Sequence, residues 1–193
     1  MTLFVGGVHA VGKTFILSSV CNELGLRHAT ASQLIREQRG FANWTASRQI
    51  EDIDENQRTL VAATRRLEKN GETIVLDGHL VLRRAENVHE KIKIETFNQL
   101  MIQGVILIEA SAEVITNRLR KRGDLTWQHS EIEVFAQKEL EHAEDVCAQL
   151  GISLVRLRSP TSLEMKTALA ALMAKMQIKQ EHQTTPPSQS GFA

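Results

Sequence analysis

The chain has 193 residues, of which 42% are hydrophobic and 24% are charged, so it carries enough apolar material for one domain-sized core. Its 23 basic and 23 acidic side chains balance, which disfavours a nucleic-acid partner held by sequence-independent contacts to the phosphate backbone. No apolar run approaches the ~20 residues that a membrane span needs, and an apolar segment begins almost at Met1, so we expect a soluble cytoplasmic protein with no membrane partner.

Hydrophobic periodicity predicts alternating strands and helices. In chain order the patterns predict a strand at 2–6, a helix at 13–25, a short segment at 26–30, helices at 32–40 and 51–69, strands at 72–79 and 104–110, helices at 111–123 and 131–150, a strand at 152–157 and a helix at 162–176. Ser32 can cap the second helix and Gly40 can end it. The strands are continuously apolar rather than alternating, which indicates a parallel sheet covered on both faces.

Two segments do not fit this alternation. Residues 84–100 show no clean pattern and are predicted to form a loop followed by a short helix. From Gln180 the composition becomes polar, with two adjacent prolines and almost no apolar side chains, so 180–193 is expected to be a disordered tail. The predicted domain therefore spans residues 1–179, and its two cysteines, Cys21 and Cys147, are expected to be buried thiols.

A glycine-rich stretch separates the first predicted strand from the first predicted helix. Residues 7–14 match G-x-x-x-x-G-K-[ST] at every fixed position, in the strand, loop and helix context that this motif requires. Without side chains at Gly7 and Gly12, the backbone can curl so that its N–H groups point at phosphate oxygens. Lys13 is expected to reach the terminal phosphates and Thr14 to bind Mg²⁺. We therefore expect this loop to hold ATP and magnesium through Gly7, Val8, His9, Ala10, Val11, Gly12, Lys13 and Thr14.

An acid at the tip of a neighbouring strand normally completes such a metal site. Asp77 and Glu109 each end a predicted strand. Asp77 is favoured because its side chain is short and Gly78 lets the chain turn sharply beside bound phosphates, whereas Glu109 precedes a helix whose positive end it could simply favour. The alternative for Asp77 is an ordinary turn residue at a strand end.

With these residues placed, the sequence from about Phe4 to Leu172 resembles the P-loop nucleoside monophosphate kinases, most closely the small adenylate-kinase-like predicted nucleotide kinases. Beyond the glycine loop the resemblance rests on "LGLRHATASQLIRE", "TIVLDGH" and "RLRKRG". It implies a three-layer α/β P-loop fold, with about five parallel strands, helices on both faces, an acceptor-binding insertion at about 30–70 and a small lid at about 120–130. It also implies that Ser32 and Arg36 bind the acceptor phosphate, and it supports Asp77.

The resemblance places Arg118 and Arg122 beside the transferred phosphate. Residues four apart share one helix face, so both guanidinium groups can converge on one polyanion, although positive charge is also favourable on a solvated helix end. The lid itself is short, and no arginine lies between Arg122 and Arg156, whereas the family lid tends to carry later arginines.

Three positions depart from the family or leave alternatives open. His79 stands where the family usually has a proline, and it can contact phosphate or satisfy a backbone group below the loop. His9 can donate to a phosphate oxygen or pack over the loop. Gln57, beside Asn56, resembles an Asn-Gln pair of the small nucleotide kinases and can read a base edge, or it can belong to a solvated helix face.

The sequence thus predicts ATP- and Mg²⁺-dependent phosphorylation of a nucleoside monophosphate, with AMP or dAMP as the first guess. Lys13, Arg118 and Arg122 would stabilise the charge on the moving phosphoryl group, and a phosphate acceptor needs no dedicated base. Two alternatives remain open. One is an ATP-binding regulatory NTPase module that acts through a protein partner, and the other is a kinase of another small metabolite.

Overall fold

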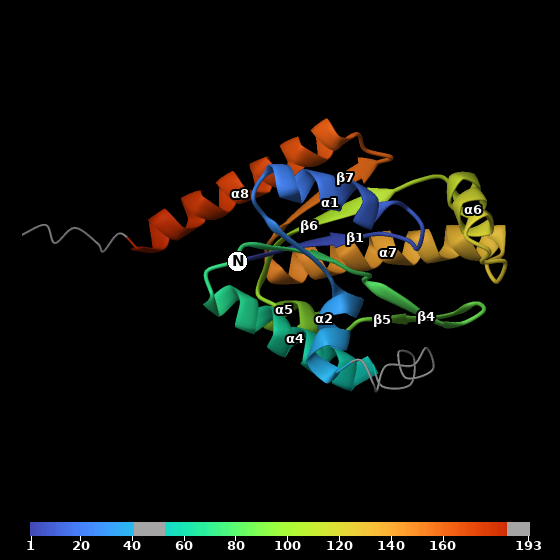
Figure 1. The fold of residues 1–193 in the computed structure, drawn as a ribbon, viewed down its shortest axis with the longest axis horizontal. Helices are drawn as coiled ribbons and strands as arrows, with labels where there is room; N and C mark the ends of the chain where they lie inside the picture. Colours follow the sequence, from blue (N-terminus) through green and yellow to red (C-terminus); the bar gives the residue numbers. More distant parts are fainter. Residues whose placement is uncertain (41–52, 185–193) are drawn as a thin grey trace, which may run out of the picture.

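The fold, a computed structural model, describes residues 1–40 and 53–184, with side chains described as far as residue 178 (Figure 1). In this part of the chain, five strands form a parallel sheet in the order β2-β3-β1-β6-β7. Their bounds are β1 (Thr2–Gly6), β2 (Arg27–Thr30), β3 (Ile74–Asp77), β6 (Ile102–Glu109) and β7 (Ser153–Arg158). The loop that follows β1, the central strand, opens at the carboxyl edge of this parallel sheet, where α/β folds place their sites.

Helices cover both faces of this sheet, as the continuous apolar strands predict. They are α1 (Lys13–Glu23), α2 (Ala31–Arg39), α4 (Ile53–Lys69), α5 (Ile94–Gln99), α6 (Ala112–Lys121), α7 (His129–Leu150) and α8 (Ser162–Thr184). Successive side chains of β1 point to opposite faces: Leu3 and Val5 pack into a core with α1 and α8, whereas Phe4 packs into a core with α4 and α5. The result is the three-layer α/β architecture that was predicted (Figure 1).

The prediction for residues 84–100 is partly wrong. The short helix exists as α5, but the expected loop is an antiparallel hairpin of β4 (Val81–Ala85) and β5 (Val88–Lys91). Its turn contains Asn87 at φ 57°, a left-handed conformation that Asn tolerates. The side chains of Arg83 and His89 face a buried carboxylate on α7, so polar residues stand where a sequence pattern would expect apolar ones.

Two helix ends also differ from expectation. Thr30, not Ser32, caps α2, because its hydroxyl accepts the N–H of Gln33 at 3.1 Å, whereas Gly40 does end the helix as predicted. Helix α8 continues to Thr184 and so passes the boundary expected at 180. The additional turn, residues 180–184, reads Gln-Glu-His-Gln-Thr, and its Gln and Glu residues are good helix formers, so a composition poor in apolar residues did not exclude a helix there. Residues 185–193 lie outside the described residues.

Cys21 and Cys147 are buried thiols, and burial raises the pKa of each to about 11. Within the described ranges, no helix has both the length and the apolar character that crossing a bilayer would require.

Candidate active site

The glycine loop follows β1 and leads directly into α1. Gly7 and Gly12 have φ values of 137° and 110°, which side-chain-bearing residues rarely adopt, and a Cβ at Gly7 would collide with the carbonyl oxygen of Ile108. Ala10 is also left-handed, at φ 59°. The loop is tightened by a hydrogen bond from the N–H of Val11 to the carbonyl oxygen of Val8 at 3.2 Å. The two fixed glycines of the motif are therefore required by the backbone path.

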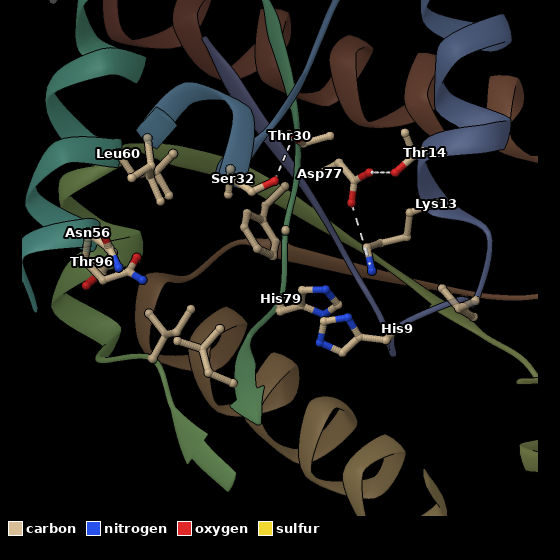
Figure 2. Close-up of a pocket in the computed structure, with 18 of the residues that line it drawn as sticks. His9, Lys13, Thr14, Thr30, Ser32, Asn56, Leu60, Asp77, His79 and Thr96 are labelled. Carbon is tan, nitrogen blue, oxygen red and sulfur yellow. Dashed lines mark hydrogen bonds and ion pairs between the residues drawn. The ribbon is translucent and has the colours of Figure 1, made fainter. Parts of the chain in front are cut away.

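Lys13 extends its ammonium group along the inside of this loop. Nζ donates to the carbonyl oxygens of Gly7 at 2.7 Å and Val8 at 3.4 Å, and lies 4.0 Å from Oδ1 of Asp77 (Figure 2). The side chain is only 7% exposed, and this burial lowers the pKa of Lys13, against the opposing attraction of Asp77. A polyphosphate is an acceptor of the kind that such a desolvated ammonium group binds strongly.

Thr14 and Asp77 form the second part of the site. The Thr14 hydroxyl donates to Oδ2 of Asp77 at 2.6 Å, because the parallel register that sets Val5 opposite Asp77 brings the end of β3 beside the start of α1. Burial alone would raise the pKa of Asp77, but neighbouring His28, Lys13 and Thr14 more than offset it and hold the pKa below its usual value. A hydroxyl and an ionised carboxylate are hard oxygen donors, so this pair fits Mg²⁺.

The alternative acid, Glu109, is directed elsewhere. Its two carboxylate oxygens accept hydrogen bonds from Arg156 at 2.9 and 3.1 Å, and it does not line the pocket described below. Of the two strand-end acids, Asp77 is the one beside the glycine loop.

Two histidines meet below the loop. The rings of His9 and His79 stack at 4.0 Å with an angle of 26° between their planes (Figure 2). Burial and the neighbouring Lys13 lower the pKa of His79 to about 3, and His79, burial and Lys13 together lower the pKa of His9 well below its usual value. Both rings are therefore neutral near pH 7, and both line the pocket, so they present uncharged N–H and N groups to it.

Glu139, on α7, is a residue that the sequence analysis missed. Its carboxylate is 1% exposed, accepts the N–H groups of Leu80 and Val81 at 3.2 and 3.3 Å, and lies 3.4 Å from Nδ1 of His79. Burial raises its pKa. The only sequence signal was an acid on the apolar face of an amphipathic helix, eight residues after another acid, Glu131, on the same face.

A pocket of about 460 Å³ extends from the glycine loop between α2, α4 and α5. Lys13, Asp77 and Thr14 lie at one end, and Leu60, Asn56 and Thr96 at the other (Figure 2). Its walls are largely apolar, with Phe4, Ile35, Ile53, Leu60, Leu82, Ile92, Phe97 and Leu100. The polar groups between them are Thr30, Ser32, Asn56, Gln57 and Thr96.

Of the residues expected to bind an acceptor, Ser32 and Gln57 line this pocket and Arg36 does not. Ser32 lines it, with its hydroxyl 3.3 Å from that of Thr30, and Gln57 lines it beside Asn56, which is buried. The solvated helix face that was the alternative for this pair therefore does not describe Asn56. Arg36 lies on α2 but is not among the lining residues. Part of the expected acceptor insertion, residues 41–52, lies outside the described residues.

Arg118, on α6, and Arg122, just after it, do not share one target. Arg118 donates from Nη1 to the carbonyl oxygens of Ala10 and Val11 and so braces the glycine loop from outside. Arg122, just after the helix, is exposed and lines the pocket. The expected i, i+4 pairing on one polyanion is therefore split, and Arg122 is the member that faces the cavity.

The segment that was expected to be a lid is attached to the β4–β5 hairpin. Arg83 donates to the carbonyl oxygen of Thr126 at 2.7 Å and to its hydroxyl at 3.1 Å, and its guanidinium lies 4.2 Å from the centre of a Trp127 ring. The same side chain makes two bonds, of 2.7 and 2.8 Å, to Glu131. The expected lid segment contains no arginine of its own after Arg122, but Arg83 from the hairpin contacts it.

The sheet order, the glycine loop and the Thr14–Asp77 pair together define a P-loop α/β domain of the kinase-like type. The chain belongs to the family whose model carries the description "AAA domain", which matches residues 6–134. No curated protein sequence matches the chain.

Solved structures share the fold at low sequence identity. A gluconokinase from Sinorhizobium meliloti 1021 is 17% identical with a TM-score of 0.54, over 95% of this chain and 97% of that one. A shikimate kinase from Aquifex aeolicus vf5 is 12% identical with a TM-score of 0.55, over 90% and 96%. A sugar kinase from Janibacter sp. HTCC2649 is 21% identical with a TM-score of 0.53, over 90% and 94%. The likeness at these identities concerns the fold.

Proposed function

We propose that the protein is an ATP- and Mg²⁺-dependent phosphotransferase that acts on a small-molecule acceptor. The observation that carries this proposal is that one cavity contains both parts of such a site: the Lys13, Thr14 and Asp77 group at the glycine loop, and an adjoining pocket between α2, α4 and α5. A switch or motor would need the first part but not the second.

In this proposal the chain contributes alignment and charge rather than covalent chemistry. The N–H groups of the loop and Lys13 hold the polyphosphate, and the Thr14 hydroxyl and Asp77 hold the metal. Bound Mg²⁺ would supply charge neutralisation on the outer phosphate oxygens. Arg122 approaches the transferred group from the pocket rim, and the segment 120–130 excludes water when it covers the cavity. The same proposal takes about 30–70 as the acceptor insertion of one domain, whose last helix continues to Thr184.

A nucleoside monophosphate, AMP or dAMP first, is the acceptor that the sequence resemblance favours. The pocket supports it, since its far end offers apolar walls to a base and the amides of Asn56 and Gln57 to the base edge. The acceptor phosphate would then lie toward Ser32, Arg122 and the neutral pair of histidines. Arg36 would contribute only after a rearrangement that brings it into the pocket.

A second acceptor class is a hydroxylated metabolite. The hydroxyl and amide side chains in the pocket wall are suited to hydroxyl groups, and the three structures compared above carry the names of kinases for gluconate, shikimate and a sugar.

An acceptor panel tests these proposals. The protein is incubated with ATP and Mg²⁺ together with nucleoside monophosphates, nucleosides, gluconate or shikimate, and ADP, phosphorylated acceptor and free phosphate are measured separately. Lys13→Met serves as the control for contaminating kinases. Acceptor-dependent ADP formation supports the proposal and identifies the class. Free phosphate without acceptor dependence would contradict it and favour a regulatory NTPase that acts through a protein partner.

A further inference from the structure

Helix α7 holds the β4–β5 hairpin with three buried polar side chains on one face. Glu139 accepts the N–H groups of Leu80 and Val81 where the hairpin begins, Glu131 lies at its middle, and His142 contacts the carbonyl oxygen of Ile92 at 2.6 Å where it ends. These positions are eight and eleven residues apart, which places them on the same side of a helix. The hairpin is therefore fixed along its whole length.

Glu131 is the most heavily bonded of the three. Besides the two bonds from Arg83, it accepts the N–H of Asn87 at 2.8 Å and lies 3.1 Å from Nε2 of His89. Its side chain is fully buried, and Arg83 is 15% exposed. A planar guanidinium that binds a carboxylate through two nitrogens has little freedom to move, which sets the direction in which Arg83 points.

The remaining contacts of Arg83 lead from the hairpin to the glycine loop. Trp127, under the guanidinium, packs edge-on against Phe135 at 5.3 Å and lies 5.6 Å from the ring of His9. His9 is itself a member of the glycine loop and stacks on His79. An unbroken series of side-chain contacts thus joins a residue of the hairpin, outside the pocket, to the part of the loop that faces the phosphates.

We infer that Arg83 is a positioning residue for the phosphate site: it fixes Trp127 against His9 and thereby holds the glycine loop and the following segment in one arrangement. The inference rests on the proposed function only in taking the glycine loop as the place where nucleotide binds. Loss of the guanidinium would release Trp127 and Thr126 together, whereas Lys, which lacks the planar fork, would restore the charge without restoring both sets of bonds.

The matched pair Arg83→Met and Arg84→Met tests this. Arg84 is on the same strand and donates to the exposed Glu90 at 2.9 Å, so its removal controls for loss of a hairpin arginine. The first readout needs no turnover: the imidazole NMR signals of His9, assigned with His9→Gln, report the ring currents of Trp127 and His79. We expect them to shift in Arg83→Met and to stay in place in Arg84→Met. Unchanged His9 signals in folded Arg83→Met would overturn the inference.

The second readout is function. Calorimetry with Mg-ADP should give a dissociation constant about tenfold higher for Arg83→Met than for Arg84→Met, with Arg83→Lys between them, and the acceptor KM should change less than twofold. If Arg83→Met does not fold, Trp127→Leu, which leaves the Arg83–Glu131 pair in place, should weaken nucleotide binding by a similar factor; unchanged nucleotide binding in Trp127→Leu would equally overturn the inference. A wild-type protein that binds no nucleotide contradicts the proposed function, while the His9 signals still decide the role of Arg83.

Discussion

Replacement of Glu131 by Gln removes the charge of the carboxylate that anchors the hairpin. The amide has nearly the same shape, and its oxygen can still accept the Nε–H of Arg83 and the N–H of Asn87, but its NH₂ group cannot accept from Nη2 of Arg83, so one of the two bonds to the guanidinium is lost with the charge. In the wild-type chain the bonds from Arg83, helped by Asn87 and His89 and opposed by burial, lower the pKa of Glu131 from 4.5 to about 2. A pKa that is lower in the folded chain means that the ionised carboxylate stabilises the folded state, and the variant removes this stabilisation.

The magnitude follows from that pKa. One pKa unit corresponds to about 1.4 kcal/mol, so the fall from 4.5 to about 2 corresponds to about 3.4 kcal/mol. Solvent reaches the guanidinium side of the pair and screens it, so we expect a loss of about 2 kcal/mol in the free energy of unfolding at pH 7. Because the folded-state pKa is the lower one, this stabilisation is complete above about pH 4.5 and disappears as the pH falls toward about 2.

Urea unfolding at pH 7 and pH 3 measures this. The difference in unfolding free energy between wild type and Glu131→Gln should be about 2 kcal/mol at pH 7 and less than about half of that at pH 3. Glu133→Gln, on the exposed side of the same helix, is the control and should change stability by less than about 0.5 kcal/mol. An equal loss at both pH values, or an equal loss in the control, would refute the assignment of the effect to the buried charge.

Three further predictions concern the site. Lys13→Met should abolish turnover but keep the far-UV circular dichroism of the wild type, and residual transfer above a few per cent would remove Lys13 from the mechanism. Arg122→Ala should lower kcat by roughly 10³, whereas Arg118→Ala should chiefly lower thermal stability; the reverse pattern in a steady-state assay and a melting curve would exchange their roles. Gly78→Ala places a methyl group 2.9 Å from the ring of Phe4 in the pocket wall. The acceptor KM should therefore rise about tenfold, whereas the nucleotide affinity should change less than about twofold. Equal effects on both substrates in kinetic titrations would contradict this.

What the sequence could predict was local. The glycine loop is specified by fixed glycines, a lysine and a hydroxyl residue within eight positions, and continuous apolar strands specify a parallel sheet with two covered faces. Asp77 and Glu109 both end predicted strands, and Asp77 could be favoured because its side chain is short and Gly78 follows it. Thr30 and Ser32, two hydroxyl residues two apart, offer the same capping signal, and only the backbone geometry separates them.

The parts that were missed depend on contacts between distant residues. The β4–β5 hairpin is held by bonds that span 42 to 59 residues of sequence, and two of its inward residues, Arg83 and His89, are polar, so neither strand shows the apolar alternation that marks a hairpin. The spacing of Arg118 and Arg122 predicts one shared helix face, but whether each meets a carbonyl oxygen of the loop or the cavity depends on how α6 packs against the loop. A helical pattern carries no information about that packing.

Helix α7 carries contacts that any folded fragment of this chain must retain, and they set a lower limit on its length. The family match ends at residue 134, between Glu131 and Glu139. A fragment cut there would lack Glu139, which accepts the N–H groups of Leu80 and Val81 just after the strand that carries Asp77. It would also lack His142, which contacts the carbonyl oxygen of Ile92. A fragment limited to the matched residues 6–134 should therefore be unstable or aggregate, and a shortened chain should retain the sequence through the end of α7 at least.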